Sequence, residues 1–473
     1  MTLQEINSLI ERETPTLAKG PVAGYVGGIY HAGQQVSHAF GTANLNTGAA
    51  MTTDTKWLLG SITKVLTASL VMRLVEQGRV DLDRPVVHYL PEFRLKEEGA
   101  AERILVRQLL DHTNGIDADT LMPVREFGPR AVESYVEHLV HCGTLFPPGT
   151  FTHYSNPGFS LAARIIERLE GMTFNEALEH NLFAPLGMTH SCTSAEKAIL
   201  GRTAIGAFPG SEAGTLRPTQ MFMLPVSGAG PGATAIVTVD DLITFSRMHL
   251  SGGKSHDGTR YLSEESTSRM RAVSYDLGTP NCAPTGLGWR IVPIAGTTAL
   301  WHGGGSPGGA SSLAVFPEHD LVMVGFATGP GAWALHDAVI KTVLKELLGL
   351  SVTAPYETGA PPTDMAAFEG TFRHFQMAMS VRAVGRQLHC QSTFEPFDDD
   401  HRKFLIGYTG TTEMPPFVLE PINQTLFAPA GAPIEAFHGI LQRLLLHSFH
   451  RPGPDGRFGF HHSHWRAARR SDP

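Results

Sequence analysis

The sequence predicts an α/β fold in its first 350 residues and a small antiparallel β domain in the remainder. Strand-like and helical segments alternate along residues 1–350, a mixture typical of α/β folds. Residues 351–364, SVTAPYETGAPPTD, are rich in Pro, Gly and Thr, as linkers often are. From residue 365 to residue 473, short alternating runs are separated by turn residues. We therefore expect two domains, residues 1–350 and 365–473, joined by a linker.

The first domain contains both kinds of hydrophobic periodicity. Residues 22–44 alternate as strands do, around Gly-rich turns, and residues 300–328 form two apolar alternating runs separated by the turn Pro-Glu-His-Asp. The helix that follows residue 61 is expected to end at Gly78, because glycine commonly ends helices. Helical periodicity is expected in four segments: residues 1–20, 62–78, 157–171 and 238–253.

The second domain is expected to consist of hairpins. Asp455-Gly456 is a turn dipeptide between two strand-like runs. Short strands of this kind pack as a sandwich or as a barrel of about a hundred residues. The strand-like runs are residues 370–375, 377–384, 387–394 and 443–450.

Composition excludes several functional classes. The chain has 473 residues, a net charge of −8, 42% hydrophobic residues and 17% charged residues, which is ordinary for a folded globular protein. The acidic balance argues against nucleic acid as a partner. No apolar run is long enough to span a bilayer, so a membrane partner is not expected.

The N-terminus and the cysteines indicate the expected compartment. Residues 1–20 lack a basic segment followed by an apolar one, which predicts a cytoplasmic protein. The four cysteines are far apart and show no C-x-x-C spacing, so neither a disulfide framework nor a zinc site is expected. No cofactor is predicted. The cysteines are Cys142, Cys192, Cys282 and Cys390.

Residues 301–309, WHGGGSPGG, superficially match two hydrolase signatures. The run from His302 to Gly305 resembles an oxyanion motif, and Ser306 fits G-x-S-x-G, the nucleophile elbow. An elbow needs a helix after the serine, with a backbone N–H that faces the oxyanion. Here Pro307 lacks that N–H, and the residues that follow alternate as a strand. Ser306 is therefore not expected to be the nucleophile.

A serine followed three residues later by a lysine is a second candidate nucleophile, and the pair occurs three times. Ser251 precedes two glycines, which favours a turn. Ser194 is expected to cap a short helix, with Glu196 and Lys197 forming a solvated charge pair. Ser61 opens the helix of residues 62–78, which is apolar around most of its circumference. Context therefore favours Ser61.

Burial of that helix would make Lys64 a candidate proton acceptor. Lys64 lies one helical turn after Ser61. Desolvation lowers the pKa of a lysine, as a proton acceptor requires. The alternative is that Ser61 is a simple cap and that Lys64 extends into solvent.

Tyr154-Ser155-Asn156 lies in a Gly/Pro-framed loop before the helix of residues 157–171. A tyrosine beside a cationic lysine can lose its proton more easily and can pass it to a leaving group. Asn156 offers an amide to an acyl side chain or to Lys64. The alternative is a loop tyrosine packed on the fold, with the asparagine shaping the turn.

Together, Ser61-x-x-Lys64, Tyr154-Ser-Asn156 and His302-Gly-Gly resemble the three active-site elements of the penicillin-recognising serine enzymes. The likeness is greatest to the class C β-lactamase-like branch, which includes DD-peptidases, D-aminopeptidases, esterases and peptide-cyclising thioesterases. It covers roughly residues 20–350. Supporting segments in the same order are residues 74–93, 106–116, 185–191, 228–245 and 286–289.

The resemblance implies a β-lactamase/transpeptidase-like α/β sandwich with an antiparallel sheet, and a lipocalin-like second domain. His302, Gly303 and Gly304 would replace the Lys-Thr-Gly strand of relatives. The backbone N–H groups of Gly305 and Ser61 would form the oxyanion hole. His302 would orient the substrate, or bind its carboxylate when protonated.

Two departures from the family pattern limit the expected function. Histidine in place of lysine removes a permanent positive charge, so at most weak β-lactam hydrolysis is expected. Without an export signal, a cell-wall role is not expected. The histidines near the C-terminus do not predict a metal site, because neighbours on a strand point to opposite faces. They are His447, His450, His461, His462 and His464.

The predicted function is a serine hydrolase or acyl transferase. Ser61 would form an acyl-enzyme with a peptide, ester or thioester carbonyl, Lys64 would be the base, and Tyr154 would relay the proton. The substrate would be a small molecule or peptide, with D-residues among the candidates. Alternatives are a thioesterase that macrocyclises nonribosomal peptidyl thioesters from a peptidyl carrier protein, a carboxylesterase or weak β-lactamase, and a non-catalytic binding protein.

Overall fold

The computed structural model describes residues 1–17, 21–119, 126, 128–375, 377–396, 398–409 and 411–471. Its first domain is built on a seven-stranded antiparallel sheet with the strand order β3-β2-β1-β11-β10-β9-β8. Each predicted alternating run in this domain forms strands of that sheet. The strands are β1 (Gly24–His31), β2 (Gln34–Asn44), β3 (Ala49–Ala50), β8 (Arg290–Ile294), β9 (Thr297–Ser306), β10 (Gly309–Phe316) and β11 (Leu321–Thr328).

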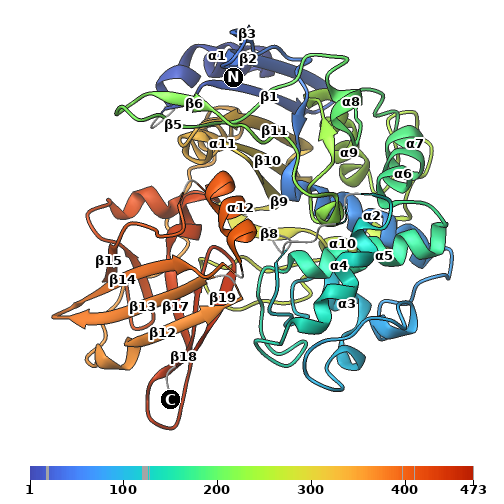
Figure 1. The fold of residues 1–473 in the computed structure, drawn as a ribbon. Helices are drawn as coiled ribbons and strands as arrows, with labels where there is room; N and C mark the ends of the chain where they lie inside the picture. The colour runs from blue at the N-terminus through green and yellow to red at the C-terminus, as the bar shows by residue number, and fades with distance from the viewer. Residues whose placement is uncertain are drawn as a thin grey trace.

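Helices cover both faces of this sheet (Figure 1). On one face, α1 (Leu3–Leu17) packs against α11 (Ala332–Leu348), and their apolar residues share one core with the sheet. On the other face, α9 (Val239–Leu250) contacts β1 and β11. The remaining helices are α2 (Thr63–Glu76), α3 (Val106–Leu110), α4 (Ala131–His138), α5 (Asn156–Glu170), α6 (Phe174–Leu178), α7 (Ala184–Leu186), α8 (Ala195–Ala198) and α10 (Glu264–Arg271). Two short ladders complete the domain: β4 (Trp57–Leu58) with β7 (Ile236–Val237), and β5 (Ala207–Pro209) with β6 (Leu216–Pro218).

Helix α2 is the centre of the larger core. Eleven of its fourteen residues are buried, as expected for a helix that is apolar all round. It ends just before Gly78, whose φ of 68° is the left-handed conformation that glycine adopts without strain. The predicted helix and its predicted end are both confirmed. Within the described part of the chain, no helix has the length and apolarity needed to cross a bilayer.

The second domain is a closed eight-stranded antiparallel barrel. Phenylalanines fill its interior, among them Phe368, Phe372, Phe427 and Phe449. Of the two architectures expected from the sequence, the structure has the barrel. Its strands are β12 (Gly370–His374), β13 (Met377–Val384), β14 (Gln387–Phe394), β15 (Phe417–Pro421), β16 (Leu426–Pro429), β17 (His447–Pro452), β18 (Phe458–Ser463) and β19 (Arg466–Arg470).

Two local predictions for the barrel were incomplete. The run 443–450 was expected to be a strand, but it begins with a 3-10 turn, Gln442–Leu445, before β17 starts. An additional helix, α12 (Asp399–Thr409), lies between β14 and β15. Its first turn is acidic, which suits the positive end of the helix dipole, and this signal was overlooked.

The barrel is attached to the first domain by buried polar contacts. Asp337 on α11 accepts hydrogen bonds from the backbone N–H groups of Leu441 (3.0 Å) and Gln442 (2.8 Å). Asn281 donates to the carbonyl oxygens of Leu446 (3.2 Å) and His462 (3.0 Å). These contacts hold the barrel beside the β8 edge of the sheet, with β19 turned toward the helical region (Figure 1).

Candidate active site

Ser61 lies in a one-turn 3-10 helix, Gly60–Ile62, immediately before α2. This turn packs directly on β9. A Cβ atom at Gly304 would lie 2.1 Å from the carbonyl oxygen of Leu59, and one at Gly60 would lie 2.5 Å from that of Gly305. Only glycine therefore permits this approach at either position. The glycines of the predicted substrate strand bring it against the serine.

Lys64 is completely buried one turn after Ser61. Its Nζ atom donates a hydrogen bond to the carbonyl oxygen of Pro231 at 2.9 Å and lies 4.6 Å from the centre of the Tyr154 ring. Burial lowers the pKa of Lys64 well below its ordinary value. Burial therefore favours the neutral amine form of Lys64, the form that can accept a proton, and the alternative of a solvent-exposed lysine is excluded.

Tyr154 is held from both domains. Its backbone N–H donates to the carbonyl oxygen of Trp465 in the barrel at 2.8 Å, and His112 stacks on its ring at 4.7 Å. The sequence predicts that a neighbouring cation eases loss of the Tyr154 proton. Instead, burial raises the pKa of Tyr154, and a hydrogen bond with Ser61 opposes this only in part. Tyr154 is therefore a protonated phenol that can pass a proton on.

His302 is also buried, with 1% of its surface exposed. Its Nδ1 atom lies 2.7 Å from the carbonyl oxygen of Gly303, so Nδ1 carries the proton that is donated there. Burial lowers the pKa of His302 well below its ordinary value. Because the lowered pKa favours the neutral imidazole, carboxylate binding by a protonated His302 is disfavoured at neutral pH, and its substrate-orienting role stays a prediction.

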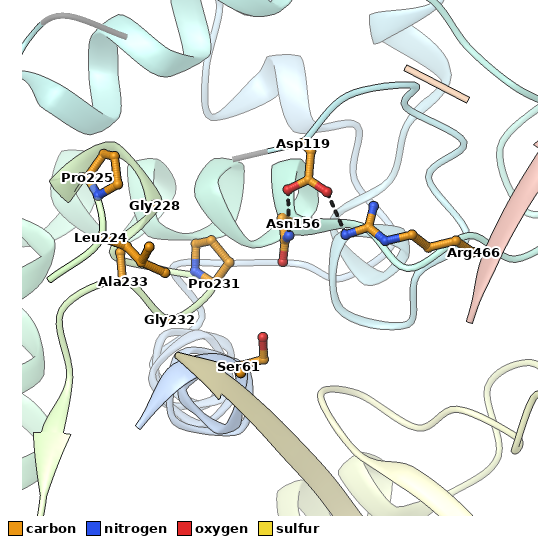
Figure 2. A pocket seen from close by; sticks show the side chains of 11 residues that line it. Ser61, Asp119, Asn156, Leu224, Pro225, Gly228, Pro231, Gly232, Ala233 and Arg466 are labelled. Carbon is orange, nitrogen blue, oxygen red and sulfur yellow. Dashed lines mark hydrogen bonds and ion pairs between the residues drawn. The ribbon is translucent and has the colours of Figure 1, made fainter. Parts of the chain in front are cut away.

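A pocket of about 110 Å³ opens above Ser61 (Figure 2). Three of the predicted site residues line it: Ser61, Asn156 and Gly305. Lys64, Tyr154, His302, Gly303 and Gly304 lie behind or beside this lining rather than in it. The other lining residues are Asp119, Leu224, Pro225, Gly228, Pro231, Gly232, Ala233 and Arg466.

An ion pair that the sequence did not reveal forms one side of the pocket. Arg466 Nη2 lies 2.5 Å from Asp119 Oδ2, and Asn156 Nδ2 donates to Asp119 Oδ1 at 2.8 Å (Figure 2). Asp119 closely follows segment 106–116, one of the segments that resemble the family, and this proximity could have indicated that Asp119 lies near the site. Nothing in the sequence indicates that Arg466, 405 positions after Ser61 by their numbers, reaches the same pocket.

Arg290 is a second basic residue that sequence reasoning missed, although it directly follows the matched segment 286–289. It is the first residue of β8, and only 1% of its surface is exposed. Its guanidinium carbon lies 5.7 Å from the centre of the Tyr154 ring and 4.7 Å from that of Trp465. The site therefore contains basic side chains from the helical region, the sheet and the barrel.

The serines rejected from the sequence have structural roles. Ser306 ends β9 and is followed by a turn and by strand β10, so no elbow forms. Ser194 caps α8 by accepting the backbone N–H of Lys197, as predicted. The side chain of Lys197 pairs with Glu179 rather than with its neighbour Glu196. Ser251 donates to the carbonyl oxygens of Arg247 and Lys254 in a turn.

The C-terminal histidines alternate between two environments, as strand geometry predicts. His461 faces Phe449 inside the barrel (5.2 Å between ring centres), whereas His462 faces Phe151 of the first domain (6.4 Å). His447 Nδ1 lies 2.8 Å from His461 Nε2. His447, His461 and His462 are packing histidines, buried in the barrel or at the domain junction, whereas His450 is half-buried and His464 is exposed.

Comparison with known proteins identifies the family. A sequence model of the family described as beta-lactamase matches residues 9–343. The chain belongs to this family. Penicillin-binding protein 4 of Amycolatopsis lactamdurans is 34% identical over 341 residues, which is 71% of this chain and 88% of that protein. The D-aminopeptidase of Brucella anthropi is 24% identical over 94% of this chain and 88% of its own length. The predicted resemblance is confirmed, and this is a family of serine hydrolases.

Solved structures show the same fold. The structure named SurE matches 99% of this chain and 100% of its own, with a TM-score of 0.74 at 23% identity. The D-amino acid amidase of Ochrobactrum anthropi SV3 matches 74% of this chain and 99% of its own, with a TM-score of 0.62 at 20% identity. The predicted β-lactamase/transpeptidase-like fold with a C-terminal lipocalin-like barrel is therefore confirmed.

Proposed function

We propose that the protein is a serine acyl transferase or hydrolase that forms an acyl-enzyme on Ser61 with peptide-type substrates whose acyl residue has the D configuration. One observation carries this proposal. Ser61 lines the pocket, and the fully buried Lys64 follows one turn later with its Nζ atom 4.6 Å from the centre of the Tyr154 ring. A nucleophile, a base and a proton relay thus meet at one pocket.

The proton path follows from these protonation states. As Ser61 Oγ attacks the substrate carbonyl carbon, its proton passes to Lys64. In this proposal the backbone N–H groups of Ser61 and Gly305 stabilise the negative charge on the carbonyl oxygen. The Tyr154 hydroxyl gives its proton to the leaving group and regains one from the Lys64 ammonium, which restores the neutral amine. The second half-reaction reverses this path with water or an amine as the nucleophile.

The pocket supports a compact acyl residue. One side is apolar, with Leu224, Pro225 and Pro231, and the other presents the guanidinium of Arg466. A substrate would place its side chain on the first side and a carbonyl or carboxylate on the second. Similar proteins are named for D-configured substrates, including D-aminopeptidases and a D-stereospecific amidohydrolase. These names support the choice of a D-residue.

The enclosure of the site favours an amine acceptor, which is the cyclising thioesterase among the predicted alternatives. Lys64 has no exposed surface and Tyr154 only 9%, and Trp465 of the barrel hairpin stacks on the Tyr154 ring. Such a site gives water little access to the base. A peptide delivered as a thioester on a carrier protein could then be released by attack of its own amine, and we propose this as a second function.

The experiment is a comparison of matched substrates. Peptidyl thioesters of one sequence, ending in D-Leu or L-Leu, are incubated with the wild-type protein, and products are weighed by mass spectrometry. We expect release from the D-ended substrate at least tenfold faster. A product of the mass of the acid indicates hydrolysis, and one lighter by a water indicates cyclisation. Equal rates would refute the D preference, and no release of either thioester would refute the proposed function.

A further inference from the structure

We propose that Arg290 is a positioning residue for the Ser61 reaction, whose buried and unpaired guanidinium imposes a positive electrostatic potential on Lys64 and Tyr154. This role rests on the proposed function. Arg290 belongs to none of the sequence elements that indicated the nucleophile, the base or the relay. Its position in the fold and the absence of partners around it suggest the role.

The guanidinium of Arg290 is enclosed without a counter-charge in contact. Among the residues that the structure describes, none forms a hydrogen bond with its Nε, Nη1 or Nη2 atoms. A charge buried in this way is costly, and proteins usually pair it with a carboxylate. The aromatic faces of Trp465 and Tyr154, at 4.7 and 5.7 Å, partly compensate it. A purely structural role would be better served by an apolar side chain.

Three basic side chains surround the Tyr154 ring, and they differ in the net positive potential that they contribute there. Lys64 Nζ lies 4.6 Å from the ring centre, but it is the base itself. The guanidinium of Arg466 lies at 5.5 Å, and its charge is largely cancelled by the ion pair with Asp119. Arg290, at 5.7 Å, has no such pair. Of the two arginines, Arg290 is therefore the one whose positive charge no carboxylate contacts.

The charged groups around Lys64 act in opposite directions. Asp119 favours its ammonium form, whereas Arg466 and Arg290 disfavour it. The same field from Arg290 favours loss of the Tyr154 proton. The field of Arg290 thus lowers the proton affinity of both groups, which favours the uncharged amine as the base and the phenol as the proton donor.

The other titratable groups near Arg290 do not pair with its guanidinium and so do not neutralise its positive charge. Cys282 and Asp111 are its other titratable neighbours, and burial raises the pKa of both, so that Cys282 stays a neutral thiol. Asp111 is held by Ser274 and Thr113 and makes no contact with the guanidinium. The neighbouring imidazoles, His112, His302 and His462, have pKa values well below the ordinary one and are neutral.

The test measures how fast a fluorophosphonate probe acylates Ser61 between pH 5 and pH 10, in the wild type, Arg290→Met and Arg290→Lys. Without the guanidinium, Lys64 holds its proton to higher pH. The acid limb of the rate profile should then move up by about one pH unit in Arg290→Met. Arg290→Lys keeps the positive charge, so its acid limb should return most of the way to the wild-type position. Arg271→Met, which removes another partly unpaired guanidinium that does not act on Lys64, should leave the limb unchanged.

Thermal unfolding of each variant shows whether it folds. Removing a buried unpaired charge should leave the melting temperature of Arg290→Met unchanged or higher. The proposal would be overturned if the wild type and Arg290→Met are both folded and their rate profiles have the same acid limb. It would also be overturned if Arg290→Met reacts more slowly but its acid limb stays where it is in the wild type. Absence of probe labelling in the wild type would instead refute the proposed function. The two failures are thus distinguishable.

Discussion

Arg466 of the barrel and Asp119 of the first domain form an ion pair of 2.5 Å at the pocket that holds Ser61. The Asp119 side chain is almost fully buried, whereas a quarter of the Arg466 side chain is exposed. The same aspartate also accepts a hydrogen bond from Asn156. The pocket is therefore completed by the second domain, and removal or displacement of the barrel would open it.

Replacing Arg466 should impair catalysis more than folding. Arg466→Ala removes both a pocket donor and the counter-charge of the Asp119 carboxylate, and we expect kcat/KM to fall about 30-fold or more. The double variant Asp119→Asn, Arg466→Ala should recover stability but not activity. Thermal unfolding and steady-state kinetics of the two variants measure both effects. Full activity in Arg466→Ala would show that the ion pair is not part of the site.

The nucleophile and base could be predicted because their signals are local. Ser61 and Lys64 are one helical turn apart, and the apolar circumference of the same helix indicates its burial. The contribution of Arg466 could not be predicted, because it depends on how two domains pack. The tip of its hairpin contains His464 and Trp465 with φ of 50° and 61°, and no sequence pattern indicates this conformation.

The sequence predicts the protonation state of Lys64 but not those of His302 and Tyr154. Burial of Lys64 follows from the helix pattern, and so does the lowered pKa. The neutrality of His302 and the raised pKa of Tyr154 depend on enclosure by Trp465 and β9, which only the folded chain shows. Electrostatic roles therefore require the complete set of buried neighbours.

Replacing Lys64 by Met should abolish acylation yet stabilise the protein. Because the folded-state pKa of Lys64 is lowered, the unfolded chain binds one more proton between that pKa and the ordinary value near 10.5. Wild-type stability therefore rises with pH in this window. Lys64→Met lacks this dependence and should be more stable by about 1–2 kcal/mol at pH 7, with the gain disappearing near pH 10.5. Urea unfolding at pH 7 and pH 10 measures it, and a less stable variant at pH 7 would contradict the neutral buried amine.

The attachment of the barrel through Asp337 should be necessary for full activity. Asp337→Ala leaves two buried N–H groups, those of Leu441 and Gln442, without acceptors, at a cost of about 2–4 kcal/mol. Loosened docking should raise hydrogen exchange in the hairpin of β18 and β19 and lower kcat/KM. Exposed Asp455, in the turn between β17 and β18, offers a control as Asp455→Asn. Unchanged exchange in Asp337→Ala would mean that other contacts hold the barrel.

The central claim is that Ser61 carries the acyl group. Intact-mass spectrometry of the protein after reaction with a fluorophosphonate tests it most directly, followed by peptide mapping. We predict one adduct on Ser61 in the wild type and in Ser306→Ala, and no adduct in Ser61→Ala. An adduct that persists in Ser61→Ala, or that maps to Ser306, would contradict the account.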